Sequence, residues 1–136
     1  MPKIVWDQTF SVNNTEIDLQ HKKWIEIMND LHNALMGDDI KKIEEIALIT
    51  LKQMQEYIHT HFSYEENYMR EIRYPENDSH ALLHKEFIEH VASLCRDMKS
   101  GKVVLNTEIM SALKQWLRDH ILQEDKKYCE FAAKEC

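Results

Sequence analysis

Glycine and proline are scarce in this chain, with two of each in 136 residues. Because tight turns depend on these residue types, the sequence lacks the turn chemistry that a sheet protein needs. Leu, Ile, Glu, Lys and Met are abundant instead, and they favour helices. The composition predicts an all-α fold, and a chain of this length can bury one core without a disulfide or a metal as a staple.

Basic charge and long apolar runs are also in short supply. Lys and Arg number 17 against 24 Asp and Glu, which gives a net charge of -7. Nucleic acids and anionic membranes require clustered basic residues, so we expect no nucleic-acid partner. No apolar run approaches the roughly 20 residues of a membrane span. We therefore expect a cytoplasmic protein with no membrane span.

Cysteine is present only three times, as Cys95, Cys129 and Cys136, and no CxxC pair occurs. An odd number without paired spacing predicts reduced thiols in a reducing compartment. Cys95 is interpreted as a small buried apolar residue of a helix.

The few helix-breaking residues divide the chain into four long segments. Gly37 followed by Asp38 and Asp39 predicts a helix end and then an N-cap. Other breaks are predicted at Pro75, with Asn77 or Asp78 as a cap, and at Gly101, with Asn106 or Thr107 as a cap. Helices are expected near 18–36, 40–72, 78–100 and 107–133, after an N-terminal arm of residues 1–17. Short connections predict one domain, residues 1–136, folded as an up-down-up-down antiparallel four-helix bundle.

Each predicted helix has a seam of residues at alternating steps of three and four, which keeps one face turned inward. The seams are apolar except for histidine and one glutamate. They comprise Ile17, His21, Trp24, Met28, Leu31 and Leu35; Ala47, Leu51, Met54, Ile58, His61, Glu65 and Tyr68; His80, His84, Phe87, Val91, Leu94 and Met98; and Ile109, Leu113, Trp116 and His120.

The polar seam positions converge at one end of the predicted bundle. His21 lies early in its helix, and His61 and Glu65 lie late in theirs. Because successive helices run in opposite directions, these positions are at the same end of the bundle. His80 and His84, early in the third helix, and His120, late in the fourth, are at that end as well. A buried imidazole or carboxylate without a partner costs several kcal/mol. A bound metal would satisfy them all, whereas a network of hydrogen-bonded histidines around Glu65 is the alternative.

The remaining histidines serve as an internal control. His32, His59 and His90 each lie one residue off the seam, so we interpret them as flank or solvated residues. Residues four apart on a helix have neighbouring side chains, so His80 and His84 can chelate one ion. Five imidazoles plus carboxylates exceed the needs of one zinc, and the ligand count predicts two metals. Ligand types alone leave Fe, Zn, Cu and Mn open.

At these residues the chain resembles the hemerythrin family, in particular its single-domain bacterial members. The pattern is DLQH at His21, HxxxE at His61 and Glu65, HxxxH at His80 and His84, and HxxxxD at His120 and Asp125. The resemblance implies two irons joined by an oxo or hydroxo bridge, one held by His80, His84 and His120 and the other by His21 and His61. Glu65 and Asp125 would bridge both irons. It further implies dioxygen as the ligand, held as hydroperoxide at one open iron position.

The choice between Glu124 and Asp125 makes a structural prediction. A regular helix turns about 40° over four residues and about 140° over five, so seam geometry favours Glu124 with His120. The resemblance favours Asp125. His120 and Asp125 can both face inward if the last helix has a wider turn between them, as a π-bulge provides at many functional sites. We therefore predict Asp125 as the ligand and an irregular helix between it and His120.

Few carboxylates and many neutral imidazoles favour reversible oxygen binding over oxygen activation, because oxidases and ferroxidases use carboxylate-rich sites. The expected roles are oxygen transport, storage or delivery to an oxygen-using enzyme. A pocket that excludes water would support these oxygen-binding roles. Its expected residues are Trp24, Phe62, Trp116, Leu117 and Ile121, although core packing alone would also explain them. Trp6 of the arm is given a packing role. The alternatives are a di-iron enzyme acting on oxygen, peroxide or nitric oxide, a sensor, iron storage, and a purely structural bundle.

Overall fold

The computed structural model describes residues 3–135 of the chain, and its side chains as far as residue 133. Within that range all regular structure is helical. The long helices are α1 (Thr15–Ala34), α2 (Ile40–Glu71), α3 (Asn77–Lys99), α4 (Thr107–Asp119) and α5 (Lys126–Glu135). A short 3-10 helix spans Gln8–Phe10, and a π-helix spans His120–Asp125 between α4 and α5.

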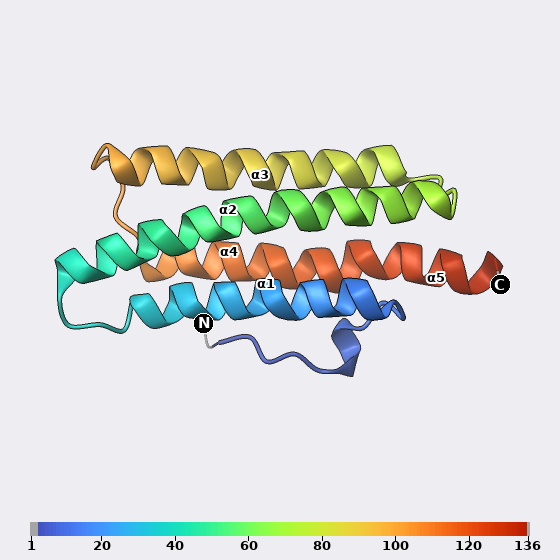
Figure 1. Ribbon diagram of the computed structural model, residues 1–136, viewed down its shortest axis with the longest axis horizontal. Coiled ribbons are helices and arrows are strands. Elements are labelled where there is room, and N and C mark those ends of the chain that lie inside the picture. The colour runs from blue at the N-terminus through green and yellow to red at the C-terminus, as the bar shows by residue number, and fades with distance from the viewer. Residues whose placement is uncertain (1–2, 136) are drawn as a thin grey trace.

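Four helical columns lie side by side, the fourth made of α4, the π-helix and α5 (Figure 1). Successive columns run in opposite directions, so the all-α, up-down-up-down bundle predicted from the sequence is confirmed. The start of α1, the end of α2, the start of α3 and the π-helix all lie toward the end of the bundle where the chain terminates (Figure 1). This topology brings the polar seam positions together.

Helix α1 begins three residues before the position predicted for it. Asn14 is extended, and its side chain accepts a hydrogen bond from the backbone N–H of Ile17 at 3.0 Å. This cap satisfies one of the amides that a helix start leaves without a partner. The next helix, α2, begins as expected, because Asp39 caps the backbone N–H of Lys41 at 3.0 Å.

Helix α2 ends through a backbone motif rather than at Pro75. The N–H of Tyr74 reaches back to the carbonyl of Met69 at 2.9 Å, and Arg73 takes a φ of 58°. This is the left-handed arrangement that glycine usually supplies after a helix. Pro75 then prevents the helix from resuming.

The predicted cap of the third helix was wrong. Neither Asn77 nor Asp78 precedes α3; Glu76 does, and its side chain makes no capping hydrogen bond. At the other end Gly101 has a φ of 78°, which suits the turn that leaves the helix. Asn106 then caps α4 by accepting from Ile109 N–H at 2.9 Å.

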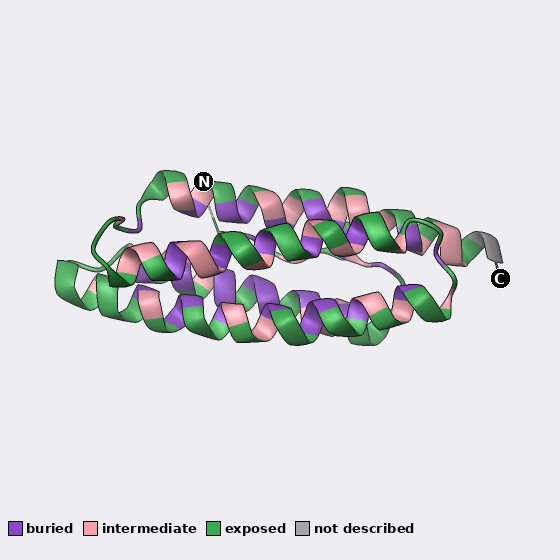
Figure 2. Ribbon diagram, turned by 90° about the horizontal axis from the view of Figure 1, so that it is seen from above, coloured by how far each residue is buried: buried purple, intermediate pink, exposed green. Residues whose placement is uncertain are grey.

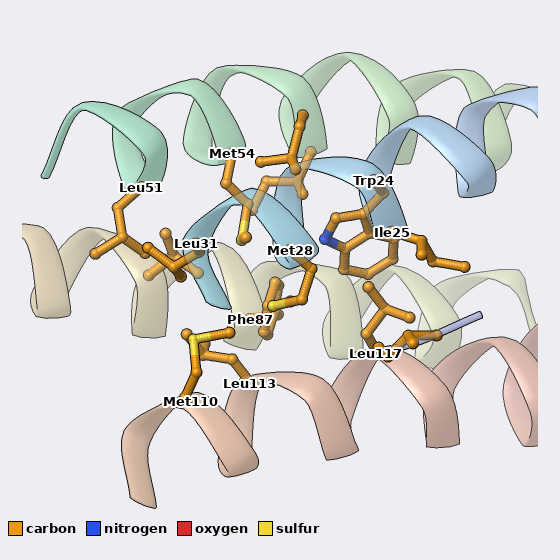
Figure 3. Packing of buried hydrophobic residues seen from close by; sticks show 14 of the residues in the cluster. Trp24, Ile25, Met28, Leu31, Leu51, Met54, Phe87, Met110, Leu113 and Leu117 are labelled. Carbon is orange, nitrogen blue, oxygen red and sulfur yellow. The ribbon is translucent and has the colours of Figure 1, made fainter. Parts of the chain in front are cut away.

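The inward faces of the helices carry the buried residues (Figure 2). Most of the predicted seam is buried. Figure 3 shows seam residues in the interior between the helices, namely Trp24, Met28, Leu31, Leu51, Met54 and Leu113. The exceptions are partly exposed: Leu35, Tyr68, Met98, Ile109 and Trp116. The predicted seam of the fourth helix was correct at Leu113 and His120. It was one residue off at its other two positions, where Met110 and Leu117 are the buried residues.

The N-terminal arm runs back along α1 (Figure 1). Asn29 holds it by accepting from the N–H of Ile4 at 3.0 Å and donating to the carbonyl of Ile4 at 2.8 Å. Trp6 packs against the core and lies under the ammonium of Lys22, 4.2 Å from the ring centre. The packing role predicted for Trp6 is therefore confirmed.

Two sequence interpretations concern the thiols and the membrane. Cys95 is buried, as predicted, and Cys129 is partly exposed, while Cys136 lies outside the described residues. None of the helices among residues 3–135 is both long enough and apolar enough to cross a membrane.

Candidate metal centre

Seven histidine and carboxylate side chains meet inside one end of the bundle. Each of them is at most 3% exposed. They come from all four columns: His21 on α1, His61 and Glu65 on α2, His80 and His84 on α3, and His120 and Asp125 at the two ends of the π-helix. The structure thus brings together every residue that the sequence singled out as a metal ligand.

The π-helix decides which acid joins the cluster. Asp125 is fully buried, whereas the side chain of Glu124 is 31% exposed and lies 3.3 Å from the ammonium of Lys127. The wider turn brings Oδ1 of Asp125 to 3.2 Å from Nε2 of His120. The predicted departure from α-helical geometry is therefore confirmed.

Glu65 lies between two groups of histidines. Its Oε1 atom faces Nε2 of His84 at 3.0 Å and of His80 at 3.3 Å. Its Oε2 atom faces Nε2 of His21 at 3.3 Å and of His61 at 3.5 Å. We call His80, His84 and His120 the three-histidine group, and His21 and His61 the two-histidine group.

Asp125 divides its oxygens between the same two groups. Oδ1 lies 3.0 Å from Nε2 of His80, in the three-histidine group. Oδ2 lies 3.0 Å from Nε2 of His21, in the two-histidine group. Each buried carboxylate therefore presents one oxygen to each histidine group, which is the arrangement required to bridge two cations.

The ring nitrogens of the three-histidine group point at one another. Nε2 of His120 lies 3.1 Å from Nε2 of His80 and 3.0 Å from Nε2 of His84. Lone pairs that face each other this closely repel unless a proton or a cation lies between them. One cation accepts a lone pair from all three nitrogens at once, so this geometry fits a metal better than a hydrogen-bond network.

Several buried polar atoms of the cluster make no hydrogen bond within the part of the chain that the structure describes. They are Nδ1 of His21, Nε2 of His61, Oε1 of Glu65, Nδ1 of His80 and both carboxylate oxygens of Asp125. Buried polar atoms are rarely left without a partner in folded proteins. Imidazole nitrogen and carboxylate oxygen are the donors that Fe, Zn and Mn accept, so the donor set fits a metal pair.

The electrostatics of the cluster also suit a cation. Burial acts against the charged form of His21, but Asp125 and Glu65 outweigh it and raise the pKa of His21 to about 9. The same balance raises the pKa values of His80 and His120 to about 9. Burial dominates at His61, where it lowers the pKa to about 3 and keeps the lone pair free. A metal that enters must displace the retained protons.

Three residues that the sequence reasoning missed support the cluster from outside. Glu66 contacts Nδ1 of His84 at 2.8 Å, Gln20 contacts Nδ1 of His61 at 2.8 Å, and the hydroxyl of Tyr128 donates to Oε2 of Glu65 at 3.0 Å. Tyr128 follows Asp125 by three residues, a helical spacing that could have revealed it. Glu66 and Gln20 lie beside seam residues, and spacing gave no signal for either.

Two of the predicted pocket residues lie against the histidine rings. The Trp24 ring centre is 5.7 Å from that of His61, and Phe62 stacks on His84 with ring centres 3.9 Å apart. Trp24 is fully buried and lies among apolar core side chains that include Met28 (Figure 3).

The other three residues predicted for the pocket come from the fourth column. Trp116 stacks on His120 with ring centres 4.5 Å apart and an interplanar angle of 8°. Leu117 and Ile121 are fully buried. Aromatic rings from α1, α2 and α4 therefore lie against histidines of the buried cluster.

The three histidines outside the seam lie apart from the cluster. His59 and His90 are exposed, and His32 is partly exposed and contacts the ammonium of Lys114. Burial and the positive charge of Lys114 lower the pKa of His32. The interpretation of these three residues as flank or solvated positions is confirmed.

Comparison with known proteins adds independent observations. Residues 12–132 match the family described as "Hemerythrin HHE cation binding domain". A "Bacteriohemerythrin" of Clostridium acetobutylicum is 30% identical over 131 residues, which cover 93% of this chain and 98% of that protein. A "Bacteriohemerythrin" of Pseudomonas aeruginosa is 29% identical and covers 96% of this chain and 82% of that protein. A solved structure titled "Crystal structure of hemerythrin:wild-type" superposes with a TM-score of 0.83 at 25% identity, covering 95% of this chain and 97% of that one.

Proposed function

This chain belongs to the hemerythrin family, and from that premise we propose that it is a non-heme di-iron protein that binds dioxygen reversibly. The proposed task is oxygen transport, storage or delivery. Membership of the family supplies the class of chemistry, and the buried cluster supplies a place for it.

The proposed ligands follow the two histidine groups. His80, His84 and His120 would hold one iron, and His21 and His61 would hold the other. Glu65 and Asp125 would bridge them. The observation that carries this assignment is the division of each carboxylate, since Oδ1 and Oδ2 of Asp125 lie 3.0 Å from nitrogens of different groups. A single cation would leave half of these contacts unexplained.

The unequal number of histidines gives the centre two different sides. Three imidazoles with Glu65 and Asp125 surround one position. Two imidazoles and Glu65 surround the other, where Oδ2 of Asp125 also reaches His21. The second position has one protein ligand fewer, and so it is the side on which a small molecule would find room. Two irons held by these residues would donate electrons to dioxygen when it binds and take them back when it leaves.

The composition of the donor set supports binding rather than turnover. Five imidazoles add no negative charge, and two carboxylates add little, whereas the di-iron bundles that activate oxygen are carboxylate-rich. Trp24, Phe62, Trp116, Leu117 and Ile121 are proposed to wall the oxygen pocket and exclude water from it. Excluding water limits the side reactions of a bound oxidant.

One observation favours a di-iron enzyme as the second candidate. The hydroxyl of Tyr128 lies 3.0 Å from Oε2 of Glu65 and donates to it. A proton donor beside a bridging carboxylate could assist the reduction of oxygen or peroxide. The two candidates differ in outcome, because a carrier returns its ligand unchanged and an enzyme consumes it.

Metal analysis combined with absorption spectra of the reduced protein tests the proposal. The expected result is two irons per chain and a visible charge-transfer band that appears with air and disappears when oxygen is removed. Continuous consumption of oxygen or peroxide would establish the enzyme instead. One zinc per chain with no spectral change would rule out both candidates.

A further inference from the structure

The outer nitrogens of two histidines in the cluster contact chemically different partners. Nδ1 of His84 faces the carboxylate of Glu66, and Nδ1 of His61 faces the amide oxygen of Gln20, each at 2.8 Å. One partner is an acid and the other a neutral amide, and they support opposite histidine groups. We infer that Glu66 and Gln20 are positioning residues that fix the tautomers of these histidines, and that the charge of Glu66 makes the three-histidine side the more electron-rich one.

The tautomer of His84 follows from its neighbours. A carboxylate only accepts hydrogen bonds, so Nδ1 of His84 carries the proton that Glu66 accepts, and Nε2 carries the lone pair. Nε2 faces Oε1 of Glu65 at 3.0 Å, toward the centre. Phe62 lies parallel to the ring of His84, with centres 3.9 Å apart. The ring is therefore held both by its outer nitrogen and by its face.

The orientation of Gln20 is fixed by a third residue. Its side-chain nitrogen donates to Oε1 of Glu16 at 3.1 Å, so its oxygen must be the atom that faces Nδ1 of His61. Nδ1 of His61 then carries a proton, and Nε2 is left with its lone pair toward Glu65. The hydroxyl of Tyr57 also donates to the backbone carbonyl of Gln20, at 3.1 Å. The amide therefore holds its histidine without placing a charge next to it.

The difference between the two partners has an electronic consequence. A carboxylate that accepts from the outer nitrogen makes a metal-bound imidazole a stronger donor, and a neutral amide does so less. The metal at the three-histidine side would thus hold its ferric state more firmly. The two-histidine side, where the proposed function places the open position, would receive less donation. The inference rests on that proposed function, because it concerns metals that the centre would hold.

Glu66 can be changed without opening the core. Its side chain is 24% exposed, unlike that of Glu65, which is fully buried. Glu66 lines a surface groove of about 620 Å³ between α2 and α3, together with His84 and Glu89. Glu89 is exposed and lies five residues after His84, so it is the matched control for a charge removed from the same groove.

Two substitutions separate orientation from charge. Glu66→Gln keeps an oxygen that can accept from His84 and removes the charge, whereas Glu66→Ala removes both. Metal-free protein would be used to read the His84 tautomer from nitrogen NMR shifts, because a metal on Nε2 would itself fix the proton on Nδ1. The zinc affinity would be measured by competition with a chelator. Iron-loaded protein would be used to measure the ferric fraction at a fixed redox poise.

For Glu66→Gln we expect an Nδ1-protonated His84, zinc affinity lowered about 10-fold and a smaller ferric fraction. For Glu66→Ala we expect a mixed tautomer and a loss approaching 100-fold. Glu89→Gln should match the wild type in every measurement. In a Glu16→Gln background, which removes the neighbouring negative charge, Gln20→Glu should enlarge the ferric fraction.

Identical affinity and poise in Glu66→Gln and Glu89→Gln would overturn the inference, as would an Nε2-protonated His84 in the metal-free wild type. Either result could occur in a protein that binds two irons and oxygen reversibly, so the proposed function would survive it. A wild type that binds no metal would instead end the proposed function.

Discussion

His120 and Asp125 are separated by five residues, yet Nε2 of His120 lies 3.2 Å from Oδ1 of Asp125. A regular α-helix would turn Asp125 about 140° away from His120. The π-helix of residues His120–Asp125 has a wider turn that reduces this offset, and Asp125 is buried in the interior. A local departure from ideal helix geometry thus supplies the second carboxylate of the centre.

The two acids at the end of this π-helix should respond differently to loss of charge. Asp125→Asn should bind fewer than two metals per chain. The substitution removes the negative charge of a side chain whose two oxygens each face a different histidine group. Glu124→Gln removes an exposed acid next door and should keep both metals. Metal analysis after loading and desalting provides the measurement. Equal metal content in the two variants would show that Asp125 is not a ligand.

Seam histidines and off-seam histidines should likewise be distinguishable. His80 is 2% exposed and faces Oδ1 of Asp125 at 3.0 Å, whereas His90 is exposed on the same helix. His80→Ala should lower the metal content below two per chain, and His90→Ala should leave it unchanged. If both variants lost metal equally, the burial of His80 would have no bearing on ligation.

Tyr128→Phe tests the hydroxyl that donates to Glu65. Hydrogen bonds to charged groups contribute about 1.5–3 kcal/mol, so the metal-free variant should unfold with a free energy lower by about that amount. A metal on Oε2 of Glu65 would offset part of the loss, so the metal-loaded variant should lose less. Chemical denaturation of both forms provides the comparison.

Tyr64→Phe is the matched control for that experiment, since Tyr64 is 41% exposed on the same helix as Glu65. Its free energy of unfolding should change little in either form. An equal loss in the metal-free and metal-loaded forms of Tyr128→Phe would contradict a metal on that oxygen.

Trp24 should limit the size of the ligand. It is fully buried, and its ring centre is 5.5 Å from that of Phe62 and 6.1 Å from that of Trp116. Trp24→Leu should lower the free energy of unfolding by about 3 kcal/mol, as large-to-small core substitutions do. It should also open space beside His61, so azide should bind the ferric protein faster.

The rate of azide binding, followed by absorption after rapid mixing, tests this second effect. Trp6→Leu, in the arm, removes an indole of the same size and should leave the rate unchanged. An unchanged rate in Trp24→Leu would place the ligand path elsewhere.

Much of this molecule could be predicted from its sequence because burial follows simple periodicity. Every histidine on the predicted seam is buried, and His59 and His90, one residue off it, are exposed. The burial of these residues depends on positions within single helices and on the antiparallel order of the bundle. The irregular helix was predicted from the family resemblance, which favoured Asp125, because seam spacing alone favoured Glu124 in a regular helix.

The features that could not be predicted depend on contacts between helices. Glu66 lies beside the seam, and only the packing of α2 on α3 brings it to His84. Gln20 likewise reaches His61 only because α1 packs on α2. The expected cap of α3 was wrong for a local reason, because Glu76 precedes that helix and Asn77 is already its first residue.

The central claim is that Glu65 and Asp125 bridge two metals held by five histidines. Anomalous diffraction from crystals of the iron-loaded protein tests it most directly. We predict two iron peaks, with one oxygen of Glu65 and one of Asp125 on each iron, and with three imidazoles on one and two on the other. A single peak, or a second iron ligated by Glu124 instead of Asp125, would contradict it.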